Sequence, residues 1–203
     1  MTEGEEARRA FVLMGLRGVG KTTVGKALAG RLGLSFVDSD ERVLLASGIT
    51  SAAWIRERGE DAFRAFEASI VLEVLDGPAT AVPDGLVLAL GGGGLSLPSV
   101  RERLGAARRA GTVLGIWLRA PCELLVARCA SDARGGLVRP TLLAADPTED
   151  CRRLAALRGP VYARFADLVV DAARAAEDVA LGVAESLAKE GHLSRATGDG
   201  LPR

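Results

Sequence analysis

Residues 15–23, Gly-Leu-Arg-Gly-Val-Gly-Lys-Thr-Thr, fit the phosphate-loop pattern Gly-x-x-x-x-Gly-Lys-Ser/Thr. Glycines let the backbone turn tightly, so that successive N–H groups point at a phosphate. A helix that begins near Lys21 would add the positive end of its dipole. The alternative is a chance glycine-rich turn, which an apolar run before the stretch and a helical pattern after it disfavour. The stretch therefore predicts a site for a nucleoside triphosphate.

Two side chains of this stretch have the chemistry that a triphosphate needs. The Lys21 ammonium is expected to reach the β- and γ-phosphates, and the Thr22 hydroxyl to bind Mg²⁺. No Asn-Lys-x-Asp guanine signature occurs, so ATP is the expected co-substrate and Mg²⁺ the expected cofactor. The residues of the stretch expected to bind ATP are Gly15, Gly18, Val19, Gly20, Lys21, Thr22 and Thr23.

Strand and helix patterns alternate along the rest of the chain. Short apolar runs predict strands at residues 11–14, 35–37, 86–90, 112–118 and 168–170. Helical spacing predicts helices at residues 22–32, 121–130, 149–164 and 177–189, with residues 41–75 mostly helical and broken near Gly48 and Gly59. The pair Gly159-Pro160 is expected to break the helix at 149–164. This alternation predicts an α/β fold of the P-loop NTPase type, in which a five-stranded parallel sheet lies between two layers of helices.

The chain has 203 residues, which suits one domain, expected over residues 11–190. Residues 1–10 are polar and acidic and predict an N-terminal extension without the apolar core of a signal peptide. Residues 131–146, rich in Gly, Arg, Pro and Asp, predict a mobile lid. Residues 191–203 predict a disordered tail, in which His192, the only histidine, would be solvated.

Charge and cysteine content exclude several classes of function. The 26 basic and 26 acidic side chains balance, so the chain has no bulk attraction for nucleic acid or acidic membranes. The three cysteines, Cys122, Cys129 and Cys151, lack zinc-type spacing and are expected to be reduced and buried. No apolar run is long enough to span a membrane. We therefore expect a cytoplasmic monomer that acts on small molecules.

Unusual residues follow two further predicted strands, at the sheet edge where parallel sheets bind ligands. Asp38 and Asp40 lie two residues apart and would point to the same side of an extended segment. One carboxylate is suited to hold Mg²⁺ and the other to orient or deprotonate an attacking hydroxyl, with an N-cap of the next helix as the alternative. Glycines 91–94 favour close approach of the backbone to a ligand, with a flexible turn as the alternative.

Taken together, these motifs resemble those of the shikimate kinase family, within the nucleoside monophosphate kinase-like P-loop group. The matching segments are GLRGVGKTT (15–23), FVDSD (36–40), GEDAFRAFE (59–67), GGG (91–93), RPTL (139–142) and RGPVY (158–162). Their order and spacing match from about Phe11 to about Leu187. The resemblance implies ATP-dependent phosphorylation of shikimate to shikimate 3-phosphate, a step of aromatic amino acid biosynthesis.

The resemblance also implies roles for individual residues. The implied catalytic residues are Lys21, Asp40 and Arg139, the last as the lid arginine that closes over the transferring phosphate. The implied substrate-binding residues are Asp40, Arg64, Gly91, Gly92, Gly93 and Arg158, with the two arginines on the shikimate carboxylate. The implied metal-binding residues are Thr22 and Asp38, and Arg128 and Arg139 join the ATP site.

The charges of a carboxylate substrate and of a transferring phosphoryl group agree with these roles. Planar guanidinium groups are the best partners for a carboxylate, which suits Arg64 and Arg158 to an acid substrate. Glu67 lies one helical turn after Arg64 and would orient its guanidinium, with an ordinary surface pair as the alternative. A lid arginine would add positive charge at the phosphoryl group on closure and exclude water.

Two other functions stay open at this stage. The lid motif has Thr141 after proline, and Val161 precedes the tyrosine, where the family usually has leucine at both places. Because lid and pocket contacts set specificity, a kinase of a related polyol acid or cyclitol such as gluconate is the first alternative. A nucleotide-binding regulatory protein without transfer activity is the second. A neutral cyclitol would not need both Arg64 and Arg158, and loss of Lys21 or Asp40 would have favoured the regulatory protein.

Overall fold

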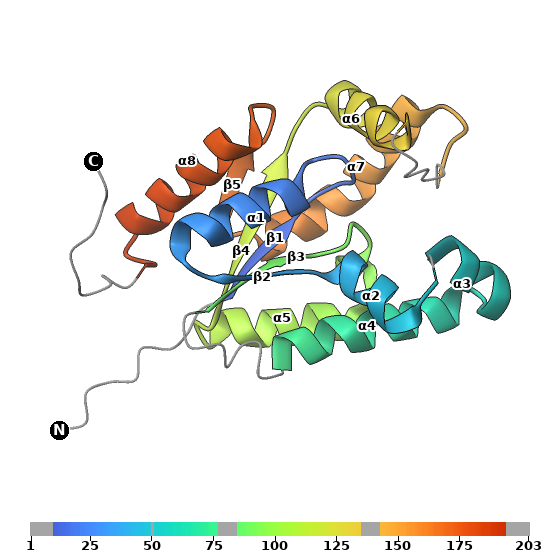
Figure 1. The fold of residues 1–203 in the computed structure, drawn as a ribbon, viewed down its shortest axis with the longest axis horizontal. Coiled ribbons are helices and arrows are strands. Elements are labelled where there is room, and N and C mark those ends of the chain that lie inside the picture. The colour runs from blue at the N-terminus through green and yellow to red at the C-terminus, as the bar shows by residue number, and fades with distance from the viewer. Residues whose placement is uncertain (1–9, 50, 77–84, 135–142, 194–203) are drawn as a thin grey trace.

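The structure is a computed structural model that describes residues 10–49, 51–76, 85–134 and 143–193. Five parallel strands form one sheet in the order β2-β3-β1-β4-β5 (Figure 1). The strands are β1 (Ala10–Met14), β2 (Ser35–Asp38), β3 (Leu86–Ala89), β4 (Val113–Arg119) and β5 (Leu168–Asp171). In the register of the central strand, Leu13 lies between Ala89 of β3 and Ile116 of β4. The predicted α/β fold with a five-stranded parallel sheet is confirmed.

Helices cover both faces of this sheet (Figure 1). In chain order they are α1 (Lys21–Leu32), α2 (Ser39–Ser47), α3 (Ser51–Arg58), α4 (Glu60–Asp76), the short 3₁₀ helix η1 (Gly94–Ser96), α5 (Pro98–Arg109), α6 (Cys122–Arg134), α7 (Pro147–Phe165) and α8 (Ala176–Lys189). Apolar residues of α4, α5 and α7 pack on one face, and those of α1, α6 and α8 pack on the other. Val12 and Phe11 of β1 enter these two opposite clusters, which explains why the central strand is apolar at every position.

Helices α2, α3 and α4 form a smaller cluster beside the sheet (Figure 1). Its buried residues are Val43, Trp54, Phe63 and Ile70, and Trp54 stacks on Phe66 with ring centroids 4.5 Å apart. These aromatic side chains therefore pack with one another. The cluster joins α4, which carries Arg64, to α2 and α3.

The predicted break at Gly159-Pro160 is wrong, because α7 is continuous with Pro160 inside it. Proline removes one backbone donor and disfavours the preceding turn. Burial on both sides of the proline offsets this cost: Leu154 lies before it, and Tyr162 and Phe165 lie after it.

The structure also revises the helix boundaries predicted near the lid and adds one helix. Helix α6 continues to Arg134, so the first residues of the expected lid are helical. Helix α5 was not predicted, although Pro98 lies in its first turn and Val100 and Leu104 are buried one turn apart.

Several predictions fall on residues outside the described ranges. These are the lid motif at 139–142 with Arg139, most of the N-terminal extension and the tail from residue 194. Residues 191–193 are described. His192 lies beside Glu190, with its Nε2 3.1 Å from the carboxylate, and Leu193 packs against the core.

The three cysteines are free thiols, as predicted, although only Cys151 is fully buried and the other two are half-buried. Within the described ranges, no helix combines the length and the apolar character that crossing a membrane requires.

Candidate active site

The phosphate loop connects β1 to α1 and has the backbone that its glycines predict. Gly18 and Gly20 have φ of +78° and +92°, a conformation that side chains rarely adopt. Gly18 also lies directly against α6, since a Cβ there would lie 2.6 Å from the carbonyl oxygen of Leu125. The loop is therefore fixed by packing as well as by its own turns.

Lys21 is the first residue of α1, and its ammonium points back over the loop. Its Nζ donates hydrogen bonds to the carbonyl oxygens of Gly15 at 2.9 Å and Leu16 at 3.1 Å. These bonds hold a positive charge beside the loop amides and the N-terminus of the helix. The arrangement is suited to a polyanion such as a triphosphate.

Asp38 joins the phosphate loop to the acceptor side of the site. Its Oδ2 accepts a 2.6 Å hydrogen bond from the Thr22 hydroxyl. Its Oδ1 accepts from the backbone N–H groups of Asp40 at 2.9 Å and Glu41 at 3.3 Å, and thereby caps α2. The N-cap was the alternative to a chemical role for the acidic pair, and Asp38 is this N-cap while its other oxygen contacts Thr22. A hydroxyl and a buried carboxylate oxygen in contact are the hard ligands that Mg²⁺ prefers, so the pair fits the ion.

One cleft of about 560 Å³ contains most of these groups. Its lining includes the predicted residues Gly18, Val19, Gly20, Lys21, Thr22, Thr23, Asp38, Asp40 and Arg128. Arg17, Arg174 and Leu90 also line it and were not predicted. The volume is in the range of small-molecule sites, and the phosphate loop and the acidic pair both line the cleft.

Arg128 of α6 lines the same cleft but uses its donors on the backbone. Its guanidinium donates to the carbonyl oxygens of Ala172 at 3.0 Å, and of Ala173 and Arg174 at 3.3 Å. These residues connect β5 to α8 and form one end of the cleft. Arg128 therefore shapes the wall of the cleft through the loop it holds.

The glycine run after β3 brings the backbone against three side chains of the predicted site. A Cβ on Gly91 would lie 2.4 Å from Oδ1 of Asp40, and one on Gly93 would lie 3.0 Å from Nη1 of Arg64. A Cβ on Gly92 would lie 3.6 Å from Nη1 of Arg158. Such close packing against side chains argues against a flexible turn, and the approach of this backbone to a ligand stays a prediction.

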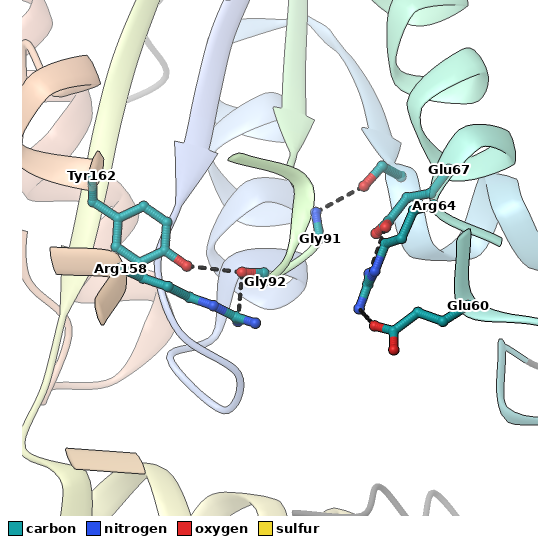
Figure 2. A network of polar contacts seen from close by, with 8 residues as sticks. Glu60, Arg64, Glu67, Gly91, Gly92, Arg158 and Tyr162 are labelled. Atoms are coloured by element: carbon teal, nitrogen blue, oxygen red, sulfur yellow. Dashed lines mark hydrogen bonds and ion pairs between the residues drawn. The ribbon is translucent and has the colours of Figure 1, made fainter. Parts of the chain in front are cut away.

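Arg64 is held in place by two carboxylates of its own helix (Figure 2). Its Nη1 donates to Glu67 at 2.7 Å and its Nη2 to Glu60 at 3.3 Å. Glu67 is only 4% exposed, so the pair is not an ordinary surface pair. The predicted orienting contact between Glu67 and Arg64 is therefore present.

Arg158 reaches the glycine run from the opposite side (Figure 2). Its Nη1 donates to the carbonyl oxygen of Gly92 at 2.7 Å, and the Tyr162 hydroxyl donates to the same oxygen at 2.9 Å. The Nε atom of Arg158 is buried and has no hydrogen-bond partner among the described residues. Arg64 and Arg158 thus flank residues 91–93.

Two contacts of the glycine run were missed by sequence reasoning. The backbone N–H of Gly91 donates to the Ser39 hydroxyl at 2.8 Å, and Tyr162 binds Gly92 as described above. The spacing of Arg158 and Tyr162, four residues apart, would have placed both on one face of a helix. No pattern within the sequence connects Ser39 to Gly91, since the contact depends on how β2 and β3 pair.

We expect a Tyr162→Phe variant to bind the acid substrate a few-fold more weakly and to lose about 1 kcal/mol of folding free energy. Burial raises the pKa of Tyr162, so the phenol stays protonated as a donor. Gly92 keeps its bond from Arg158, which limits the loss. Steady-state kinetics should show the change in KM for the acid with kcat nearly preserved. An increase in the KM for ATP instead would contradict a role in positioning the glycine run.

The buried Glu67 makes stability depend on pH. Burial favours the neutral acid and raises the pKa of Glu67; its bond to Arg64 opposes this shift, and the charge of Asp40 adds to it. A carboxyl whose pKa is higher in the folded state contributes stability below its unfolded pKa of about 4.3. That contribution is lost as the pH rises through the folded pKa.

A Glu67→Gln variant is therefore expected to gain stability relative to the wild type as the pH rises from about 4 to about 8. The glutamine keeps an acceptor for Arg64 but does not titrate. The variant therefore removes the titration of residue 67 while preserving the hydrogen bond to Arg64. Urea unfolding of both chains across this pH range measures the difference. A difference that stays constant would show that Glu67 has an ordinary pKa.

Comparisons with known proteins cover nearly the whole described domain. A family model described as shikimate kinase matches residues 17–188. The shikimate kinase of Paramagnetospirillum magneticum is 44% identical over 163 residues, which are 80% of this chain and 75% of that protein. The solved structure of shikimate kinase from Acinetobacter baumannii in complex with shikimate superposes with a TM-score of 0.77 and 30% identity, covering 91% of this chain and 96% of that one. A gluconokinase from Sinorhizobium meliloti, with a TM-score of 0.54 and 20% identity, shares the fold alone.

Proposed function

The chain belongs to the shikimate kinase family, and from this premise we propose how it phosphorylates shikimate with ATP. The proposed products are shikimate 3-phosphate and ADP. One observation of the structure supports this proposal most strongly. The glycine run lies between the phosphate-loop cleft and two arginines, with Asp40 packed against Gly91 at the junction. The donor and acceptor sites therefore adjoin.

Asp40 is the proposed acceptor-side base. Its carboxylate lies in the cleft with Lys21, and it would take the proton of the substrate hydroxyl as the oxygen attacks the γ-phosphorus. The bond to the bridging oxygen of ATP breaks, and ADP leaves with the electron pair. Thr22 and Asp38 would hold Mg²⁺, whose charge would offset that of the phosphates.

Lys21 would stabilise the charge that develops on the β- and γ-phosphate oxygens. Its two hydrogen bonds to the loop place the ammonium before ATP binds, which reduces the reorganisation needed during transfer. The loop amides and the N-terminus of α1 add fixed positive potential on the same side. Lys21, the loop amides and α1 would therefore supply positive charge around the triphosphate. Arg64 and Arg158, which would bind the acceptor, are not part of this group.

Arg64 and Arg158 are the proposed partners of the substrate carboxylate. They approach the glycine run from opposite sides, and Glu67 fixes the orientation of Arg64 (Figure 2). A carboxylate between them would accept charge-assisted hydrogen bonds from both. This pair supports an acid acceptor over a neutral cyclitol.

Arg139 remains the proposed lid arginine, and its position lies outside the described residues. A monomeric state and a cytoplasmic location also remain predictions. Size-exclusion chromatography with light scattering measures the first directly.

An Arg64→Ala variant is expected to raise the KM for shikimate by about 10- to 100-fold, because a charge-assisted contact to the carboxylate is lost. The KM for ATP should change little, since Arg64 does not line the nucleotide cleft. Arg56→Ala is the matched control, as Arg56 lies on the neighbouring helix α3 and is largely exposed. If only the apparent affinity for ATP fell, the assignment of Arg64 to the carboxylate would be wrong.

A coupled ADP-release assay across shikimate, quinate, gluconate and a neutral cyclitol tests the choice of acceptor. We expect the highest kcat/KM with shikimate and little turnover with the cyclitol. A preference for gluconate would support the alternative function, for which the resemblance in fold to a gluconokinase is the only structural argument. ADP release that no acceptor stimulates would contradict both.

A further inference from the structure

A second hollow, of about 680 Å³, lies between α5 and α7. Its lining residues are Arg101, Glu102, Gly105, Arg108, Arg109, Pro160, Val161, Arg164 and Phe165, and we call it the α5–α7 groove. None of these residues lines the nucleotide cleft. The groove has no part in the chemistry proposed above.

Positive charge is in excess around this groove. Four arginines and one glutamate line it in a chain whose net charge is zero. Arg108 is neutralised by Asp167, to which it donates through Nε at 3.0 Å and also through Nη2. Although burial alone would raise the pKa of Asp167, its hydrogen bonds from Arg108 and Gly115 lower it, so this carboxylate stays charged. The remaining arginines therefore outnumber the remaining carboxylate by three to one.

Those remaining arginines lack ionic partners within the described ranges. Arg101 donates to the carbonyl oxygens of Leu95 at 2.9 Å and Ser96 at 3.0 Å, which are neutral acceptors. Arg109 and Arg164 are exposed, and neither forms an ion pair with a described residue. Three arginines from two helices thus line one hollow, and none of them forms an ion pair with a described residue. Such a site attracts anions.

The floor of the groove is apolar. Pro160, Val161 and Phe165 of α7 form this apolar part of the lining together with Gly105 of α5. A Cβ on Gly105 would lie 3.6 Å from Cε1 of Phe165 and 3.4 Å from Nη1 of Arg109, so its absence widens the groove. Glycine costs stability inside a helix, yet here it leaves space beside an aromatic ring.

We propose that the α5–α7 groove binds a small organic anion, with its apolar body on the floor and its carboxylate or phosphate on the arginines. Charge alone would suit inorganic phosphate, and the floor alone would suit a neutral ring. The combination of a guanidinium rim with an apolar floor is complementary to a molecule that has both parts. The volume of the groove suits a single small ligand.

Residue-resolved NMR of the full chain tests this proposal with three probes: benzoate, inorganic phosphate and benzyl alcohol. Benzoate should shift the arginine Nε–H signals of Arg109 and Arg164 and the amide signals of the groove. Phosphate should bind several-fold more weakly, and benzyl alcohol should cause no saturable shift. Benzoate shifts confined to residues 91–93 would place the anion in the active site and overturn the proposal. Equal affinity for phosphate and benzoate would also overturn it.

Two variants separate recognition from folding. The double variant Arg109→Gln/Arg164→Gln should weaken benzoate binding by about tenfold or more, because two charged donors are lost. Arg153→Gln is the control, since Arg153 is an exposed arginine of the same helix outside the groove. Gly105→Ala should raise the thermal midpoint, as alanine favours the helix, and yet weaken benzoate binding several-fold by filling the hollow. Unchanged affinity in both groove variants would refute the site.

Discussion

A Lys21→Ala variant is expected to transfer phosphoryl groups about a thousandfold more slowly than the wild type, or to lose activity entirely. Hydrogen bonds to the carbonyl oxygens of Gly15 and Leu16 hold the Lys21 ammonium in place over the phosphate loop. Its loss removes a preorganised cation from the point where charge develops in the transition state. Stability should change little, because Lys21 is only half-buried and α1 keeps its buried residues.

Lys26→Ala provides the matched control for this variant. Lys26 lies on the same helix and forms an exposed ion pair with Glu41 at 3.2 Å. Exposed pairs contribute about 0–1 kcal/mol, so activity and stability should both stay close to those of the wild type. Steady-state kinetics and thermal melts of the three chains provide the comparison. Normal turnover in the Lys21 variant would refute its catalytic role.

An Asp40→Asn variant is expected to lower kcat by about 10² to 10⁴-fold, because asparagine cannot accept the proton of the substrate hydroxyl. The fold should persist, since the cap of α2 uses the backbone N–H of Asp40 and the side chain of Asp38. The values of KM for both substrates should change much less than kcat. This pattern would identify Asp40 as a group that acts in the transition state.

Glu41→Gln is the control for Asp40, since it removes the neighbouring exposed carboxylate that lines the same cleft. Its turnover should remain within a few-fold of the wild type. If the Asp40 variant turned over as fast as the Glu41 variant, the base would have to be another group. If both lost activity equally, general loss of negative charge in the cleft would explain the effect.

The sheet and the phosphate loop could be predicted because their signals are local. Short apolar runs mark all five strands, and the glycines with Lys21 and Thr22 mark the turn between β1 and α1. The signal of α5 was also present, since Val100, Leu104 and Ala107 have helical spacing, but sequence reasoning overlooked it. The continuity of α7 through Pro160 depends instead on the burial of Tyr162 and Phe165 against other elements. A local sequence pattern does not predict such burial.

In the candidate site, too, contacts within one helix could be predicted and contacts between distant elements could not. The pairing of Arg64 with Glu67 follows from their spacing on a helix, and the structure confirms it. The burial of Glu67 does not follow from spacing, because it depends on tertiary packing around α4 and the glycine run. Likewise, the two donors on the carbonyl oxygen of Gly92 come from a helix 66 and 70 residues away in the chain. Contacts of this kind arise only when distant elements pack.

Phosphorus NMR of a reaction with ATP, Mg²⁺ and shikimate tests the central claim most directly. We expect one new phosphate monoester signal, with its phosphorus coupled to the proton on carbon 3 of shikimate, and one ADP for each ester formed. This result requires the triphosphate site and the acid pocket to meet across a single cleft. Inorganic phosphate with ADP and no ester would contradict the account, because the site would then be transferring the phosphoryl group to water.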